Sequence, residues 1–436
     1  MNVILLEVER FLDTYGMNHR AIDMEACCRR FIEEMELGLD GAGSLKMFPT
    51  YLEVDKRIPN DEKVIVIDAG GTNLRVALIH FEESGRPVID GFRKAPMPGS
   101  QGMVGKDQFF AIIADQMEDL ARQAGRIGFC FSYPTEMQPD KDGRLTQFSK
   151  QIQAPAVVGE LIGANLREIL AQRGAGAGWR TVLLNDTVAT LLAGKAAAGG
   201  REYDSYVGFI FGTGINSSYI EANSKIRKCP GLDHSGEQII NVESGNFNRL
   251  PLGRLDEELD RNTIDPGQYL FEKMFSGRYL GGVCFHTLRR AAADGLFSVP
   301  AAAVLNRLEG LATVTVNEFL LRPDLTANPL GEAANRGTTS DRIKLYALLD
   351  SLVERAAKLA ALNLAAVVVK SGKGERPDRP VCLTADGTTF YQMKGLKLRT
   401  EYYLTQYLTE EKGRFWELIG VDNAPLIGAA IAGLTN

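Results

Sequence analysis

Apolar residues recur at two different spacings along the chain, and the change of spacing divides it into segments. In residues 1–40 they recur every three or four positions, which predicts two helices, with Asp23 as the N-cap of the second. At residue 63 the pattern becomes KVIVIDAGGTNLRVALIHF, in which two β-strands flank a Gly-Gly turn. The order of strand, glycine turn and strand returns in YVGFIFGTGINSSYIEA, from residue 206.

The two glycine turns, at Gly70 and Gly212, each open a half of the chain in which strands alternate with helices. This repetition indicates an internal structural duplication, and the alternation predicts mixed sheets covered by helices, hence an α/β fold. Residues 107–124 and 158–172 are predicted helices of the first half, and residues 267–370 are mostly helical. The small apolar residues of 424–436 predict a helix that packs closely against a neighbour.

Composition and charge argue against several classes of protein. Lys+Arg is 49 and Asp+Glu is 55, a net charge of −6 without a basic stretch, so no nucleic-acid partner is expected. No run reaches the ~20 apolar residues of a membrane-spanning helix, and MNVILLEVERF lacks the basic start of a secretory signal. The scattered cysteines and histidines lack metal-site spacing, which favours reduced thiols in a cytoplasmic protein with no membrane partner.

The segment from Asp68 to Asn73 is the first candidate for chemistry. A strand delivers Asp68 to the edge of a sheet, where it could hold a water on Mg²⁺. Gly70 and Gly71 permit positive φ, so that the N–H groups of the turn form a nest for phosphate, and Thr72 and Asn73 add donors. The segment is neither a Walker A loop nor a Rossmann fingerprint, and an ordinary β-hairpin with a Gly-Gly turn is the alternative.

The second turn, Gly212-Thr213-Gly214, follows the same logic. Two such turns facing each other across a cleft would hold the two ends of a triphosphate chain. Asp186 follows the apolar strand 181–184, where it is either a helix N-cap or a general base for an attacking hydroxyl. Each of the remaining acidic candidates, taken alone, is expected to be a solvated surface charge. The residues that together would line a site for a polyhydroxy ligand are Lys150, Asn185, Asp186, Asn216, Glu243 and Glu272.

The chain resembles the eukaryotic-type hexokinases, in a compact single-unit form, through segments that follow one another in the expected order. The resemblance runs from about residue 24 to the end. These segments are IEEMELGLDGAGSLKMFPTYLE, IDAGGTNLRV, GFCFSYP, LTQFSK, LLNDTVATL, GTGINSSYIE, NVESGNF, PGQYLFEKMFSGRYLG and ADGTTFYQ.

The resemblance implies an actin-like ATPase (ribonuclease H-like) fold, with two domains of mixed sheets and a cleft between them. Residues 60–185, with helix 424–436 returning to them, would form the small domain, and residues 1–59 and 186–423 the large domain. The implied reaction uses ATP and Mg²⁺ to phosphorylate the 6-hydroxyl of a hexose, as in the first step of glycolysis. Glucose would be the first substrate, with mannose and fructose as further candidates, and the products would be hexose 6-phosphate and ADP.

The resemblance also assigns roles to residues by position. Asp186 would be the catalytic base, and Lys150 would place a positive charge near the transferred phosphoryl group. The residues that would line the sugar pocket are Ser132, Pro134, Ser149, Lys150, Asn185, Asp186, Asn216, Glu243 and Glu272. Asp68 would also reach Mg²⁺ through water. The residues that would surround the nucleotide and its phosphates are Asp68, Gly70, Gly71, Thr72, Asn73, Thr213, Gly277, Arg278, Thr339, Gly387 and Thr388.

Other interpretations stay open beside this one. A sugar-binding regulatory protein of the same fold, with little turnover, would be expected to have lost the base or a phosphate turn, and this chain keeps both. A chaperone-like or actin-like nucleotide switch would not need the set Ser132, Lys150, Glu243 and Glu272. A dehydrogenase is disfavoured because no GxGxxG follows a strand. A monomer and a homodimer are both compatible with the sequence.

Overall fold

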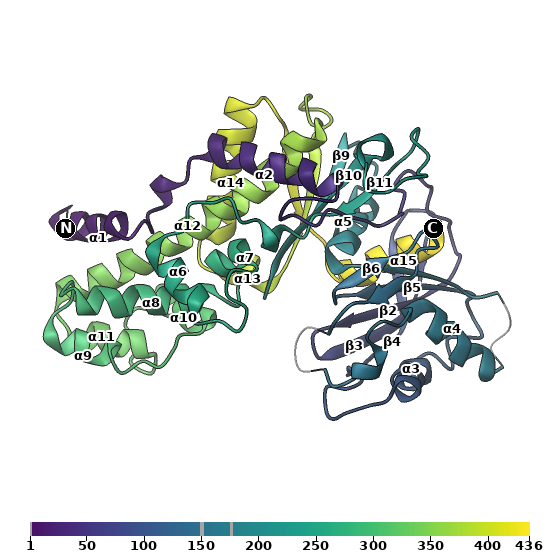
Figure 1. Cartoon of the computed structure of the whole chain (residues 1–436), viewed down its shortest axis with the longest axis horizontal. Coiled ribbons are helices and arrows are strands. Elements are labelled where there is room, and N and C mark those ends of the chain that lie inside the picture. Colours follow the sequence, from purple (N-terminus) through teal and green to yellow (C-terminus); the bar gives the residue numbers. More distant parts are fainter. Residues whose placement is uncertain (1, 149–151, 175–177) are drawn as a thin grey trace.

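The computed structural model of this protein describes residues 2–148, 152–174 and 178–436. The molecule is elongated, with two sheets toward one end and a helical extension at the other (Figure 1). The smaller sheet has five strands in the order β4 (Pro87–Pro96), β3 (Asn73–Phe81), β2 (Val64–Gly70), β5 (Arg126–Phe131) and β8 (Arg180–Leu184). A separate hairpin joins β6 (Thr135–Met137) to β7 (Gly143–Leu145).

The five-stranded sheet is buried on both faces, which explains the unbroken apolar run of β2. Ile65 and Ile67 face a core shared with α3 and α4, whereas Val64 and Val66 face a core shared with α5 and α15. The β2–β3 hairpin is antiparallel, and β2, β5 and β8 are parallel, so the sheet is mixed as the sequence predicts.

The larger sheet repeats this plan. Its β9–β10 pair is an antiparallel hairpin around the second glycine turn, and β9, β12 and β13 are parallel. The repeated hairpin is the structural counterpart of the duplication inferred from the sequence. The strands follow the order β1 (Phe48–Pro49), β11 (Glu237–Asn241), β10 (Ile215–Ala222), β9 (Ser205–Phe211), β12 (Val381–Asp386) and β13 (Trp416–Gly420).

The helices cover the sheets and form the extension at the far end (Figure 1). In the first part of the chain they are α1 (Asn2–Thr14), α2 (Met24–Leu39), α3 (Lys106–Asp115), α4 (Ile162–Gln172) and α5 (Asp186–Ala197). In the second part they are α6 (Arg254–Arg261), α7 (Leu270–Phe275), α8 (Leu280–Ala293), α9 (Val299–Leu305), α10 (Thr313–Leu321), α11 (Pro329–Arg336), α12 (Thr339–Ser371), α13 (Thr388–Gln392), α14 (Leu396–Leu404) and α15 (Ala424–Thr435). Asp23 caps α2 as predicted, since its side chain accepts a hydrogen bond from Ala26 N.

The predicted helix 107–124 is shorter in the structure. Helix α3 ends at Asp115, and residues 116–123 continue as turns. Met117 and Leu120 are nevertheless buried, because the turns are closed by backbone bonds three residues apart. That spacing is close to the helical one, so the apolar pattern alone does not separate the two conformations.

Helix α15 follows β13 of the large sheet and lies against the small sheet. It packs against β2 and β5 and crosses α5. A side chain at Gly428 would overlap the backbone of Ala189, so the crossing requires the small residues of this helix. Residues 64–184 supply the strands of the small sheet, and the large sheet uses strands on both sides of them in the chain. The division into two domains near residues 60 and 185 stays a prediction.

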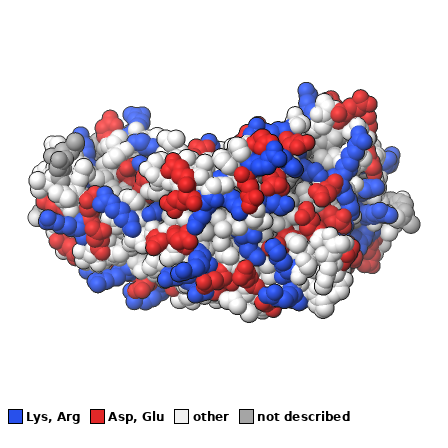
Figure 2. Space-filling view, turned by 90° about the horizontal axis from the view of Figure 1, so that it is seen from above, with Lys and Arg blue, Asp and Glu red and all other residues white. Residues whose placement is uncertain are grey.

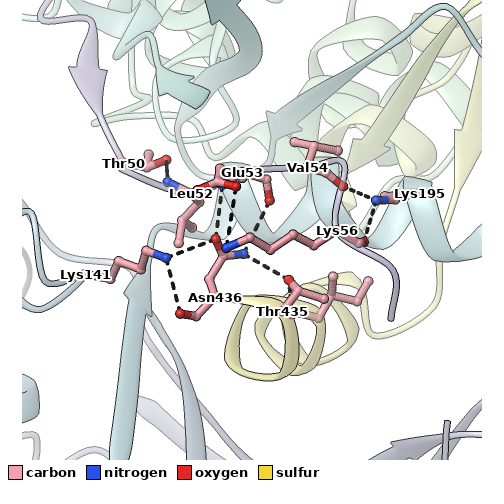
Figure 3. Close-up of polar contacts among 10 residues, drawn as sticks. Thr50, Leu52, Glu53, Val54, Lys56, Lys141, Lys195, Thr435 and Asn436 are labelled. Atoms are coloured by element: carbon pink, nitrogen blue, oxygen red, sulfur yellow. Dashed lines mark hydrogen bonds and ion pairs between the residues drawn. The ribbon is translucent and has the colours of Figure 1, made fainter. Parts of the chain in front are cut away.

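The connection from β1 to β2 is held by side chains from three other segments (Figure 3). Lys195 of α5 donates to two main-chain carbonyls of this connection. Asn436, directly after α15, accepts from Glu53 N at 3.1 Å and donates to Glu53 O at 3.3 Å. Lys141, in the β6–β7 turn, donates to the main-chain oxygen of Asn436 at 3.2 Å and to its Oδ1 at 3.3 Å. The β1–β2 connection, which joins the large sheet to the small one, is therefore fixed by contacts to α5 and to the end of α15.

Acidic and basic side chains are interspersed over the face shown in Figure 2, without a large area of one sign. In the described parts of the chain, no helix combines the length and the apolar character that crossing a bilayer requires. This holds also for the 33-residue helix α12, which carries charged residues along its first half.

Candidate active site

A cavity of about 560 Å³ lies between the two sheets and is lined from both of them. Its walls come from the two glycine turns, the segment after β5, the junction of β8 and α5, and the segments around β11 and α7. The predicted site residues that line it are Asp68, Gly70, Gly71, Asn73, Ser132, Pro134, Asn185, Asp186, Thr213, Asn216, Glu243, Glu272, Arg278 and Gly387.

Other predicted residues lie beside the cavity or outside the described chain. Thr72 lines a separate hollow of about 470 Å³ on the β3–β4 side of the first turn. Gly277 N donates to Gly212 O at 2.9 Å, so Gly277 supports the second turn. Thr388 is the exposed first residue of α13, next to the cavity residue Gly387. Ser149 and Lys150 lie outside the described residues, so their predicted roles stay predictions.

The structure does not bring Thr339 to the cavity. Thr339 is the exposed first residue of α12, in a capping box in which Thr338 Oγ1 accepts from Asp341 N at 3.2 Å. Asn363 of the same helix accepts a hydrogen bond from Ser217, which lies next to the cavity residue Asn216. Thr339 and Asn363 are about 36 Å apart along the helix axis, at 1.5 Å per residue. Thr339, which the resemblance placed at the nucleotide, is therefore part of a helix start here.

The first turn joins β2 to β3 through Gly71 and Thr72, and Gly71 adopts a φ of +63°, which glycine tolerates without a Cβ clash. Asp68 is buried two residues before the turn, and Arg75 Nη1 lies 3.3 Å from Asp68 Oδ2. Burial raises the pKa of Asp68 to about 6, although Arg75 acts in the opposite direction, and the charges of Asp186 and Asp386 raise it further. Negative charge is thus concentrated at this end of the cavity.

The second turn is held in place by segments that follow it much later in the chain. Gly212 N donates to Gly214 O at 3.0 Å, which closes the turn. Arg278 N donates to Thr213 O at 3.0 Å, and Thr389 Oγ1 donates to Gly212 O at 3.1 Å. The two turns of the predicted phosphate site therefore line one cavity from opposite sheets.

Asp186 lies where β8 ends and α5 begins. The N-cap of α5 is Asn185, whose Oδ1 accepts from Thr187 N at 2.8 Å, so the capping role does not account for Asp186. Asp186 Oδ1 accepts from Thr187 N at 2.8 Å and from Thr187 Oγ1 at 3.3 Å, and the residue lines the cavity. The N-terminal end of a helix favours the ionised carboxylate, the form that accepts a proton.

Glu243 is held by two amides from neighbouring strands. Its Oε1 accepts from Asn241 Nδ2 at 2.9 Å and from Asn216 Nδ2 at 3.2 Å. The backbone of Glu243 has a φ of +59°, a conformation uncommon outside glycine that tends to occur at functional sites. Burial raises the pKa of Glu243, and the hydrogen bonds from the side-chain amides of Asn241 and Asn216 act in the opposite direction.

Glu272 approaches the same region from α7. Its Oε2 accepts from Ile215 N at 3.1 Å, directly after the second glycine turn. Burial raises the pKa of Glu272 to about 7, and the charge of Glu243 raises it further. Two carboxyl groups with raised pKa values in one cavity are typical of a functional site, which distinguishes them from solvated surface charges.

The cavity also contains residues that the sequence reasoning missed. Arg75 follows Asn73 by two positions on β3, so the alternation of a strand places both on one face. Asp386 directly precedes the predicted Gly387. Their closeness in sequence to predicted site residues could therefore have identified Arg75 and Asp386. Lys46 and Tyr269 are brought to the cavity by the tertiary fold, without such a signal. The missed residues with polar side chains are Lys46, Thr50, Arg75, Tyr133, Thr135, Asn241, Asn246, Tyr269 and Asp386.

Comparisons with known proteins agree with this arrangement. Sequence profiles described as hexokinase match residues 7–196 and 206–435. Hexokinase-1 of Arabidopsis thaliana is 30% identical over 430 residues, covering 91% of this chain and 85% of its own length. Hexokinase-7 of Oryza sativa subsp. japonica is 28% identical over 434 residues, covering 91% of this chain and 90% of its own. Among solved structures, the hexokinase from Schistosoma mansoni complexed with glucose superposes with a TM-score of 0.78 at 24% identity, covering 100% of this chain and 99% of that one.

The fold is therefore the α/β, actin-like fold with two mixed sheets that the resemblance implies. The chain belongs to the hexokinase family, whose members are enzymes that phosphorylate hexoses with ATP.

Proposed function

We propose that this protein phosphorylates glucose at its 6-hydroxyl, with ATP and Mg²⁺, and that Asp186 is the catalytic base. One observation carries the proposal: Asp186, both glycine turns, and the carboxyl groups of Glu243 and Glu272 line a single cavity between the sheets. A sugar and a triphosphate bound there together would meet at Asp186.

The sugar is held by groups that match its hydroxyls. On the side of the large sheet, Asn216, Glu243 and Glu272 offer amide and carboxyl groups. On the side of the small sheet, Asn185 adds an amide and Ser132 a hydroxyl. A site built from such groups discriminates strongly against an analogue that lacks a hydroxyl, because a buried polar group is then left unpaired.

In the transfer step, Asp186 orients the 6-hydroxyl and accepts its proton while the hydroxyl oxygen bonds to the γ-phosphorus. The bond from that phosphorus to the β–γ bridging oxygen breaks, and ADP leaves. Little covalent chemistry is required of the protein, so positioning and charge neutralisation supply most of the rate. The backbone N–H groups of the first turn and the Arg75 guanidinium supply positive charge toward the phosphates.

The residues at the phosphate end fit a magnesium ion that is shared with the nucleotide. Negative charge is concentrated at that end of the cavity by Asp68, Asp186 and Asp386. The charges of Asp186 and Asp386 are close enough to raise the pKa of Asp68. The described residues include no group of three or more His, Cys, Asp or Glu arranged to hold a metal alone, so phosphate oxygens would complete the site. Asp68 would hold the ion through water, and the ion when bound neutralises developing phosphate charge.

The test is a coupled assay of the purified protein with ATP and Mg²⁺ against glucose, mannose, fructose and 6-deoxyglucose. We expect turnover of glucose and none of 6-deoxyglucose, which has no acceptor hydroxyl. Release of ADP with 6-deoxyglucose at the glucose rate would show that the 6-hydroxyl is not the acceptor. Hexose binding without any turnover would instead identify a sugar-binding regulatory protein and contradict the proposal.

A further inference from the structure

Next to Glu272 in the sequence lies a lysine whose ammonium group is buried. The side chain of Lys273 is 3% exposed, and its Nζ lies 2.7 Å from Asp260 Oδ1 and 2.8 Å from Thr263 Oγ1. It also lies 2.7 Å from the main-chain oxygen of Asp265 and 3.0 Å from Asp265 Oδ1. All of these partners belong to residues 260–265, at the end of α6 and in the connection from α6 to α7, so one side chain ties this connection to α7.

The α6–α7 connection has no apolar anchor of its own. Each of residues 261–268 is exposed or only partly buried, and Ile264 at its tip is 95% exposed. Polar contacts hold the connection instead: Asp260, besides binding Lys273, accepts from Gly267 N at 2.9 and 3.1 Å. The cluster of Asp260, Thr263, Asp265 and Lys273 is therefore what orders this segment.

Helix α7 is held by that cluster on one side and by apolar packing on the other, where Phe271 and Phe275 are buried in the core. It has six residues, too few for a helix that is stable by itself, and its N-cap is Tyr269, whose φ is +52°. Adjacent residues of a helix project about 100° apart. Lys273 therefore turns into the connection while Glu272 turns into the cavity, where it accepts from Ile215 N. Lys273 thus adds a polar anchor to the apolar packing of Phe271 and Phe275, and together they set the rotation of α7 that aims Glu272.

We propose that Lys273 is a positioning residue for hexose affinity, acting by anchoring α7 so that Glu272 and Tyr269 are held in place before the sugar arrives. This inference rests on the proposed function, in which Glu272 binds the sugar. It assigns no chemical step to Lys273. Its effect belongs in binding of the sugar, and the rate of phosphoryl transfer from the filled site is expected to change little.

The chain supplies a matched control in a second buried ion pair, whose acidic member also lies on α6. Arg355 of α12 pairs with Asp256 of α6, and both side chains are 3% exposed. Arg355 Nη1 lies 3.0 Å from Asp256 Oδ1. Asp256 and Asp260 are four residues apart, so the two buried ion pairs share α6, but neither member of the control pair lines the cavity. Breaking either pair leaves a buried charge unpaired and destabilises the fold.

The experiment compares Lys273→Met with Arg355→Met. For both variants, KM, kcat, the melting temperature, and the dissociation constant for glucose by calorimetry are measured. Both melting temperatures are expected to fall. Only Lys273→Met is expected to weaken glucose binding. The expected loss is about tenfold, the equivalent of one well-placed hydrogen bond. The KM for ATP should stay unchanged, and kcat should stay within about threefold of the wild-type value.

Unchanged glucose binding in Lys273→Met, or equal weakening in both variants, would overturn the positioning role. If Lys273→Met does not fold, Asp265→Asn removes one charge of the cluster with little change of shape. A rise of about two- to fourfold in the glucose dissociation constant then supports the proposal, and an unchanged constant overturns it. Turnover of hexose by the wild-type protein is measured first: its absence overturns the proposed function, whereas a failed contrast between variants overturns only the role of Lys273.

Discussion

Asn216 Nδ2 lies 3.2 Å from Glu243 Oε1, so an amide that follows the second glycine turn orients a carboxylate 27 residues later in the chain. The other end of the same amide accepts from Ser217 N at 2.8 Å and from Ser244 N at 3.2 Å. Behind it, Asn363 of α12 accepts from the hydroxyl of Ser217 at 2.9 Å. Glu243 is therefore aimed by hydrogen bonds that exist before any ligand arrives, which lowers the cost of ordering the site on binding.

Glu243→Gln should weaken hexose binding more than it slows the transfer step. The glutamine cannot accept from Asn216 and Asn241 with one oxygen and still present a second acceptor to a sugar hydroxyl. We expect the KM for glucose to rise by about tenfold or more and the KM for ATP to stay unchanged. Initial rates at varied glucose and fixed, saturating ATP give the answer, and an unchanged glucose KM would remove Glu243 from the sugar site.

Glu272→Gln should stabilise the protein at high pH while it weakens sugar binding. The pKa of Glu272 is about 7 in the folded state, against 4.5 as the reference value. The folded state thus binds this proton more tightly, so the free energy of unfolding falls as the pH rises from about 4.5 to about 7. A glutamine does not titrate, so the variant does not lose this part of the free energy of unfolding as the pH rises.

For Glu272→Gln, we expect a gain of about 1–3 kcal/mol at pH 8 that disappears below about pH 4.5. Urea unfolding of the variant and the wild-type protein at both pH values measures it. Glu257→Gln, at an exposed position on α6, is the control. An equal difference between variant and wild type at pH 4 and pH 8 would show that the charge of Glu272 is not the cause.

Arg75→Met should act on the nucleotide side of the site. Burial raises the pKa of Asp68, and the guanidinium of Arg75 partly offsets that effect. Without Arg75, the pKa of Asp68 rises above about 6, so Asp68 becomes protonated at a higher pH. We expect the acidic limb of the pH–rate profile to move to higher pH and the KM for ATP to rise about five- to tenfold, with glucose binding unchanged.

The control for this variant is Arg86→Met, since Arg86 pairs with Glu82 at 4.0 Å on the exposed β3–β4 turn. Its pH–rate profile should coincide with that of the wild-type protein. If Arg75→Met leaves the acidic limb in place, Asp68 does not govern that limb and the ion pair has only a structural role.

The parts of the fold that the sequence predicted are those where local pattern and tertiary burial agree. Residues 64–67 are apolar at every position because both faces of β2 are buried, and both glycine turns lie between antiparallel strands. Asp186 was singled out because a carboxylate just after a buried strand is conspicuous, and the structure places it at the cavity. At 107–124 the pattern recorded burial correctly, but it could not show that turns replace the helix after Asp115.

The parts of the site that the sequence missed depend on contacts between distant segments. Asp386 joins the cavity because β12 pairs with β9 in parallel, a pairing between strands more than 170 residues apart. Conversely, Thr339 was expected near the nucleotide because the family resemblance assigned that role by position, whereas here Thr338 and Asp341 form the start of a helix. A helix cap and a phosphate-binding turn use the same residue types, and only their position in the fold separates them.

The most direct measurement of the central claim is the kinetics of Asp186→Asn together with its glucose dissociation constant. The substitution keeps the shape of the side chain but removes the proton acceptor. We predict that kcat falls by about 10²- to 10⁴-fold while glucose still binds, because Asn185 caps α5 without Asp186 and the sugar-facing groups keep their partners. Turnover within about threefold of the wild-type rate would contradict the account, because another group would then have to accept the proton.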